Sequence, residues 1–190
     1  MHTGLEERPD GSERLAAFYA ERARHGVALI VTGGVAPAPT GVTMEGGAVL
    51  NDASQLPHHR IVTDAVHREG GKIALQILHT GRYSYQPNLV APSAIQAPIN
   101  RFTPHALSHD EILALIDDFA RCAALAREAG YDGVEVMGSE GYLINEFLAA
   151  RTNQRDDEWG GDYARRMRFA VEVVRAVRER AGADFSIIFR

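Results

Sequence analysis

The chain has 190 residues, of which 45% are hydrophobic, and a formal net charge of −5. This composition supports one hydrophobic core and argues against a nucleic-acid partner, because surfaces that bind nucleic acid are basic. No apolar run approaches the roughly 20 residues of a membrane span, and residues 1–7 lack the apolar region of a signal peptide. We therefore expect a cytoplasmic protein without a membrane contact.

The first unit of the chain is a helix followed by a strand. Asp10 or Ser12 can cap a helix that ends at Gly26. Residues 27–31, Val-Ala-Leu-Ile-Val, predict a strand that is buried on both faces. Residues 1–4 are too few for a strand but can be the end of one.

The second unit repeats this order. Asn51 or Asp52 starts a helix that closes at Gly71, and residues 72–78 form the next expected strand. The proline-containing segment that follows, residues 83–104, is too long for an ordinary connection, so we expect a functional loop over one face of the molecule.

The third and fourth units complete the pattern. Ser108 and Glu111 form a capping box for a helix that ends at Gly130, before a short strand within residues 133–137. A last helix precedes Gly182 and a strand in residues 185–190. The expected inward residues of this last helix are Met167, Ala170, Val171, Val174 and Val177.

Glycines that close a helix just before a strand of bulky apolar residues indicate a parallel α/β sheet. A doubly wound sheet and a (β/α)8 barrel both fit. We favour the barrel because no glycine-rich dinucleotide fingerprint follows a strand, while polar residues gather at the strand ends. A whole barrel takes about 250 residues, so we predict a partial TIM barrel, approximately strands 2 to 5 with the end of strand 1. Its expected inward residues include Ile77, Val134 and Ile188.

Three segments carry a family resemblance: residues 75–82 (LQILHTGR), 133–143 (GVEVMGSEGYL) and 153–161 (NQRDDEWGG). They resemble the FMN-dependent Old Yellow Enzyme superfamily and, within it, the bacterial NADPH-dependent 2,4-dienoyl-CoA reductases. Many relatives place two ring-nitrogen donors after the fourth strand, where this chain has Met137 and Glu140. This departure favours the dienoyl-CoA branch over the enone reductases.

The resemblance implies that residues 1–190 are an incomplete FMN-binding barrel domain of an enzyme that reduces 2,4-dienoyl-CoA to enoyl-CoA in unsaturated fatty acid degradation. In that family NADPH electrons reach FMN through FAD and a 4Fe-4S cluster, whose sites are absent from this chain. Cys122 is the single cysteine, which agrees with the absence of a cluster site. The alternatives are a related flavin ene-reductase or amine dehydrogenase with a non-CoA substrate, or a non-catalytic fragment.

The expected catalytic residues are Tyr142 and Glu140. A tyrosine by itself is more often a packing residue, but the resemblance implies that Tyr142 protonates the dienolate formed by hydride transfer. Glu140 by itself would be a solvated carboxylate; two residues before Tyr142, it can orient the phenol or tune its pKa. His79 is a candidate for the wall of the site.

The resemblance also implies a set of binding residues. For FMN these are Met1, His2, Gly34, Gln76 and Arg190, with Gln76 on the pyrimidine edge and Arg190 beside flavin N1. For the acyl-CoA substrate they are Arg151, Thr152, Asn153 and Gln154, which could instead form a hydrogen-bonded turn. The remaining histidines have no metal-ligand spacing, so no metal site is expected.

Overall fold

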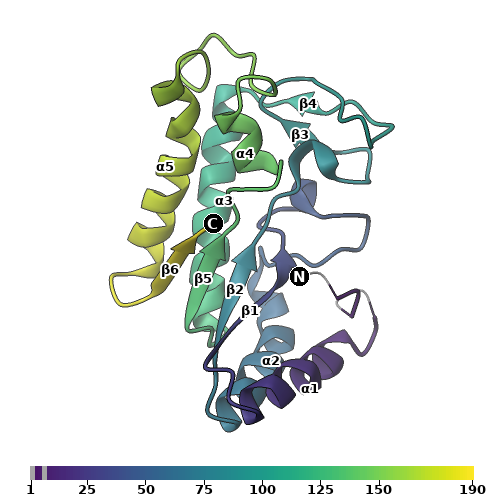
Figure 1. The fold of residues 1–190 in the computed structure, drawn as a ribbon, viewed down its shortest axis with the longest axis vertical. Coiled ribbons are helices and arrows are strands. Elements are labelled where there is room, and N and C mark those ends of the chain that lie inside the picture. Colours follow the sequence, from purple (N-terminus) through teal and green to yellow (C-terminus); the bar gives the residue numbers. More distant parts are fainter. Residues whose placement is uncertain (1–2, 6–7) are drawn as a thin grey trace.

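Figure 1 shows the computed structural model, which describes residues 3–5 and 8–190. In chain order the elements are α1 (Gly11–Arg24), β1 (Leu29–Val35), the 3-10 helices η1 (Pro39–Gly41) and η2 (Ala53–Gln55), α2 (Leu56–Arg68), β2 (Lys72–Ile77), η3 (Gly81–Tyr83, 3-10), β3 (Val90–Ala91), β4 (His105–Ala106), α3 (His109–Glu128), β5 (Gly133–Val136), α4 (Leu143–Leu148), α5 (Tyr163–Ala181) and β6 (Ser186–Phe189).

The main sheet has the strand order β1-β2-β5-β6, and all neighbouring strands are parallel. Each new strand is added at the same edge, as in a barrel; a doubly wound sheet would reverse its order at a switch point. The strands point toward the end of the molecule that carries α4 and the separate β3–β4 pair (Figure 1). The predicted α/β class with a parallel sheet is confirmed.

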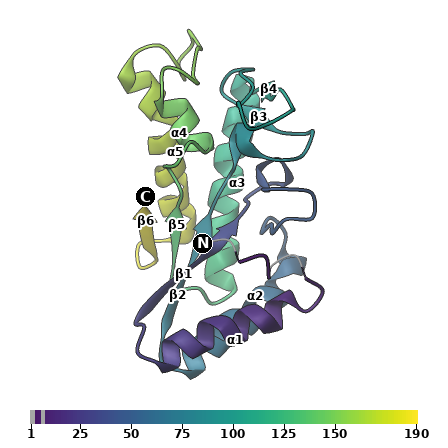
Figure 2. The same cartoon turned by 45° about the vertical axis from the view of Figure 1, so that its right-hand side comes forward.

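One face of the sheet is covered by helices, with α3 and α5 behind it in Figures 1 and 2. The strand side chains on this face are fully buried: Ile73, Leu75, Ile77, Val134 and Val136. The prediction that Ile77 and Val134 face the barrel interior is therefore wrong. Because side chains alternate along a strand, Gln76 and Glu135 take the other face instead. Ile188 pairs with Glu135 and lies on that second face, as predicted.

The buried face of α5 also differs from the prediction. Phe169, Ala170, Val173, Val177 and Ala181 are buried, whereas Met167 and Val171 are 38% and 41% exposed. Phe169 fixes this orientation: its ring stacks on Phe147 of α4 at 4.2 Å and meets Phe119 of α3 edge-on at 6.4 Å. The aromatic contact between three helices therefore decides which of two overlapping apolar stripes faces inward.

Two element boundaries need correction. β1 runs from Leu29 to Val35 instead of from residue 27 to residue 31, because it continues to pair with β2 past a bulge between Val31 and Gly34. Its expected burial on both faces is wrong at the start, where Val27 and Leu29 are exposed. At the end of α2 the left-handed residue is Gly70, with φ +77°, and Gly71 is the point where α1 comes close. Thr3 and Gly4, the described part of the expected first strand end, are not in a strand.

The predicted start of α3 is confirmed, since both hydrogen bonds of the Ser108–Glu111 capping box are present. Within residues 83–104, Asn100 fastens the long segment by donating to the carbonyls of Arg82 and Ser84. Among residues 3–5 and 8–190, no helix is both long and apolar enough to cross a membrane.

Candidate active site

Two buried polar side chains lie on the sheet face opposite the helices. The Gln76 amide donates to Glu135 Oε1 at 2.6 Å, and the two residues are 6% and 8% exposed. They are register neighbours, and the same row continues to Gly34 on β1 and Ile188 on β6. A buried amide and a buried carboxylate are costly without hydrogen-bond partners, and here each supplies one to the other.

Tyr142 stands where the loop after β5 enters α4. It is the N-cap residue of that helix, and its carbonyl accepts the Glu146 N–H at 2.8 Å. Its half-buried ring meets the Tyr83 ring edge-on, at 6.1 Å between centroids and 81° between planes. Burial raises the pKa of Tyr142 above its ordinary value, and the negative charge of Glu140 raises it further. The phenol thus keeps its proton at neutral pH and can act as a donor.

Glu140 and Arg190 meet at the ends of β5 and β6. Arg190 Nη2 donates to Glu140 Oε1 at 2.7 Å, and both side chains are about half exposed, at 53% and 51%. Glu140 has φ +63°, which no other non-glycine residue shows in the described part of the chain. A strained backbone at a strand end often accompanies function. The ion pair holds a carboxylate and a guanidinium together at this end of the sheet.

The 3-10 helix η3 forms the wall next to Tyr142. A methyl group added at Gly141, which has φ +82°, would lie 2.7 Å from Tyr83 Cε2, so this ring rests directly on the backbone before Tyr142. Sequence reasoning missed Tyr83. The cluster of aromatic residues that follows β2, Tyr83 and Tyr85 within three positions, was the signal that could have found it.

His79 does not lie on the wall of the site, contrary to the expectation. It is 1% exposed, its Nδ1 accepts the Gly81 N–H at 3.1 Å, and its Nε2 lies 3.2 Å from Thr40 Oγ1. Burial lowers the pKa of His79 to about 3, so the ring is neutral. His79 therefore stabilises the loop after β2 through its contacts with Gly81 and Thr40.

The residues expected to contact acyl-CoA have unequal environments. Asn153 is 3% exposed, and its Nδ2 donates to the carbonyls of Phe147 and Trp159, both at 2.8 Å. Thr152 Oγ1 donates to the Glu146 carbonyl at 2.7 Å. These two side chains fasten the turn between α4 and α5. The side chains of Arg151 and Gln154 are exposed.

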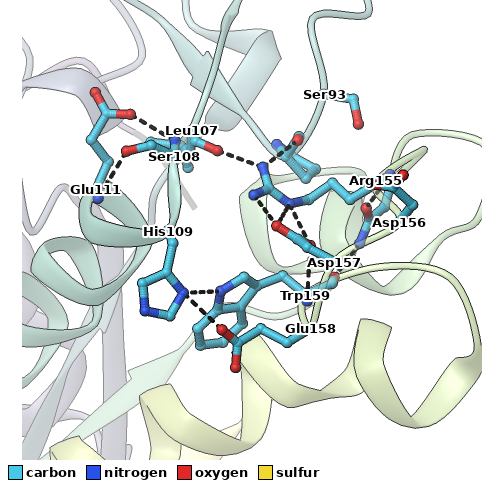
Figure 3. Close-up of polar contacts among 12 residues, drawn as sticks. Ser93, Leu107, Ser108, His109, Glu111, Arg155, Asp156, Asp157, Glu158 and Trp159 are labelled. Carbon is cyan, nitrogen blue, oxygen red and sulfur yellow. Dashed lines mark hydrogen bonds and ion pairs between the residues drawn. The ribbon is translucent and has the colours of Figure 1, made fainter.

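Figure 3 shows how the segment after this turn is anchored. Arg155 forms an ion pair with Asp157 at 2.5 Å and donates to the carbonyl of Leu107. Trp159, which is 1% exposed, donates its indole N–H to His109 Nδ1 at 3.1 Å. The motif of residues 153–161 thus joins the start of α3 to the loop before α5.

Replacing Asn153 by Ala should lower the free energy of unfolding by about 1–3 kcal/mol, because two buried carbonyls would lose their donor. The same substitution at the exposed Gln154 should change it by less than about 0.5 kcal/mol. Urea unfolding of the full-length protein measures both. An unchanged stability for Asn153→Ala, combined with a raised KM for the acyl-CoA, would instead point to a substrate contact.

The whole chain, residues 1–190, matches the sequence model of the NADH:flavin oxidoreductase / NADH oxidase family. The chain belongs to this family of FMN enzymes, to which the Old Yellow Enzyme relatives also belong. Its sheet corresponds to part of their TIM barrel.

Relatives and solved structures support the assignment. The chain is 42% identical over its full length to 29% of a metal reductase from Desulforamulus reducens, and 38% identical over 94% of its length to 27% of an N,N-dimethylglycine/sarcosine dehydrogenase from Chromohalobacter salexigens. It resembles 2-naphthoyl-CoA reductase in complex with 2-naphthoyl-CoA (TM-score 0.88, 32% identity, 94% of this chain and 30% of that one). Morphinone reductase gives a TM-score of 0.84 at 34% identity over 93% and 53% of the two chains. The chain thus spans less than a third of the length of the metal reductase and of the dimethylglycine/sarcosine dehydrogenase.

Proposed function

We propose that this chain forms part of the FMN site of a 2,4-dienoyl-CoA reductase and supplies its proton donor. The observation that carries the proposal is the half-buried phenol of Tyr142 at the end of β5, with a raised pKa and Glu140 nearby. A similar structure contains a CoA thioester, 2-naphthoyl-CoA, which supports an acyl-CoA substrate.

The residues present fit FMN. Gln76 is a buried amide on a sheet face that the described helices leave open, and it can pair with the pyrimidine edge. Arg190 places a positive charge at the end of β6, where it would stabilise an anionic reduced flavin. Met1 and His2 lie outside the residues that the structure describes. A side chain at Gly34 would overlap Leu78, so packing within the chain is itself a reason for this glycine.

When bound, FMN supplies the hydride. Tyr142 donates its O–H proton to the carbanionic dienolate, and the tyrosinate regains a proton from water, so that one hydride and one proton are added to the diene. Burial and, to a lesser extent, the charge of Glu140 raise the pKa of the phenol, and Arg190 forms an ion pair with Glu140. Tyr142 therefore releases its proton only to a strong base such as the dienolate.

The remaining assignments belong to the same proposal. Residues 1–190 are part of an FMN-binding barrel domain, and the exposed side chains of Arg151 and Gln154 contact the acyl-CoA, while Thr152 and Asn153 shape the turn beneath them. NADPH is the electron source, with FAD and a 4Fe-4S cluster carrying electrons to FMN in the full-length protein. The reaction takes place in the cytoplasm.

The second candidate is an ene-reductase or amine dehydrogenase with a non-CoA substrate, which the similarity to the dimethylglycine/sarcosine dehydrogenase and morphinone reductase favours. Steady-state kinetics of the full-length protein with a 2,4-dienoyl-CoA, cyclohexenone and sarcosine separate the two. We expect kcat/KM to be at least about tenfold higher for the dienoyl-CoA, the effect of about 1.4 kcal/mol of extra transition-state binding. A higher value for either other substrate would contradict the proposal.

Replacing Gln76 by Leu should weaken FMN binding by about 1–3 kcal/mol, because Glu135 and the flavin edge would both lose a hydrogen-bond partner. Fluorescence titration of the flavin-free full-length protein measures this affinity. Gln154→Leu, at an exposed position, is the control and should leave FMN affinity unchanged. Undiminished affinity in Gln76→Leu would show that Gln76 only pairs with Glu135.

A further inference from the structure

Glu146 is a buried carboxyl group that the proposed mechanism does not use. It lies on α4 at 1% exposure, next to the fully buried Phe147. Its Oε1 accepts the Arg82 N–H at 2.9 Å, but its Oε2 and Arg82 Nε are both buried without a partner among the residues that the structure describes. Since a half-satisfied buried carboxyl group is costly, its presence calls for a reason beyond packing.

The Glu146 carboxyl group fits closely against η3. A side chain at Gly81, which has φ +58°, would overlap the carboxyl oxygens, so these two positions are matched to each other. The Leu143 N–H donates to the His79 carbonyl at 3.1 Å and joins the start of α4 to the residues just before η3. The distance between η3 and α4 is therefore set by a polar contact at Glu146.

The contact between the Glu146 carboxyl group and η3 is connected to Tyr142 in two ways. Through the backbone, the Glu146 N–H binds the Tyr142 carbonyl at 2.8 Å. Through η3, Glu146 accepts a hydrogen bond from the Arg82 backbone N–H. The next residue, Tyr83, places its ring edge-on against the Tyr142 ring. A shift of η3 would thus move the aromatic wall of the phenol.

We propose that Glu146 is a positioning residue for the proton transfer: its carboxyl group holds η3 against α4 and thereby fixes the Tyr83 ring against the phenol of Tyr142. Glu146 acts through Arg82 and Tyr83 and does not touch the substrate. The catalytic part of this inference rests on the proposed role of Tyr142.

Gln is the conservative substitution at position 146, because the Glu146 side chain is mainly uncharged near neutral pH. Burial raises the pKa of Glu146 to about 8, and the Arg82 N–H and the Arg82 charge oppose this rise only in part. Near neutral pH the side chain is thus mainly an uncharged acid, and Gln reproduces its size and its acceptor oxygen.

The experiment compares variants of the full-length protein by stopped-flow measurement of flavin reduction by NADPH and of reoxidation by a 2,4-dienoyl-CoA. Glu146→Gln should retain the reoxidation rate within about threefold. Glu146→Leu should lower it by roughly 10- to 100-fold, the effect of a misplacement of the order of 1 Å, with reduction by NADPH unchanged. Glu179→Leu, at an exposed position on α5, is the matched control.

A double-mutant cycle separates positioning from general damage. Tyr83→Leu should reproduce the loss, and Glu146→Leu combined with Tyr83→Leu should be no slower than the slower single variant, because both act through one contact. If Glu146→Leu does not fold, Glu146→Asp, which withdraws the acid from the Arg82 N–H, takes its place. Additive losses, or a Gln variant as slow as the Leu variant, would overturn the inference.

A failure of the proposed function would give a different set of reoxidation rates from a failure of the positioning role. If Tyr142→Phe reoxidises at the wild-type rate, Tyr142 is not the donor. If Tyr142→Phe is slow while Glu146→Leu and Glu146→Asp are fast, only the positioning role of Glu146 is wrong.

Discussion

Replacing Tyr142 by Phe is expected to slow reoxidation of the reduced enzyme by a 2,4-dienoyl-CoA by roughly 10²–10⁴-fold, the usual contribution of a general acid. The substitution removes only the O–H group. The phenyl ring can keep its edge-on contact with Tyr83, and the backbone can still cap α4. Reduction by NADPH and FMN content should therefore stay unchanged, which stopped-flow absorbance and flavin extraction measure.

The matched control for this substitution is Tyr163→Phe. Tyr163 is 62% exposed at the start of α5, so loss of its hydroxyl group should not change the reoxidation rate. The position of the product double bond, determined by NMR, is a second readout, because a different proton source can protonate another carbon of the dienolate. An unchanged rate together with an unchanged product would refute the assignment of Tyr142.

Replacing Phe169 by Ala is expected to lower the free energy of unfolding by about 3–5 kcal/mol, the usual cost of removing a buried aromatic side chain. Phe169 is fully buried between Phe147 on α4 and Phe119 on α3. Because Tyr142 is the N-cap residue of α4, the cavity should also loosen the surroundings of Tyr142. Urea unfolding of the full-length protein measures the loss.

The control lies two residues further along the same helix. Val171 is 41% exposed, so Val171→Ala should change the free energy of unfolding by less than about 0.5 kcal/mol. A larger loss in Val171→Ala than in Phe169→Ala would mean that the orientation of α5 is the one expected from the sequence pattern and not the one in the structure.

Much of the fold could be predicted from local sequence signals. The strand around Val134 is rich in β-branched residues, and the capping box of Ser108 and Glu111 marks the start of α3. The limits of β1 could not be predicted, because Gly33 and Gly34 resemble a turn, whereas pairing with β2 resumes at Gly34 after a bulge. The direction in which Ile77 points depends on which sheet face the helices cover, and periodicity does not specify this in a doubly buried strand.

The candidate site, too, could be predicted from the sequence only in part. The motif around Tyr142 and the polar break at Gln76 mark positions at strand ends, which topology brings to one edge of the sheet. The partners of these residues could not be foreseen. Glu135 faces Gln76 only through the register of β2 and β5, and Glu140 meets Arg190 across fifty residues of chain. Glu146 was missed because a single carboxylate in a short helix is usually solvated.

Anaerobic titration of the NADPH-reduced, full-length protein with a 2,4-dienoyl-CoA, followed at the visible flavin absorption, shows whether this substrate accepts electrons from the flavin. If residues 1–190 carry part of an FMN site for this substrate, the oxidised flavin absorption should return in proportion to added dienoyl-CoA, quickly in the wild type and slowly in Tyr142→Phe. A flavin that remains reduced after excess dienoyl-CoA, yet is reoxidised by cyclohexenone, would contradict the proposed substrate.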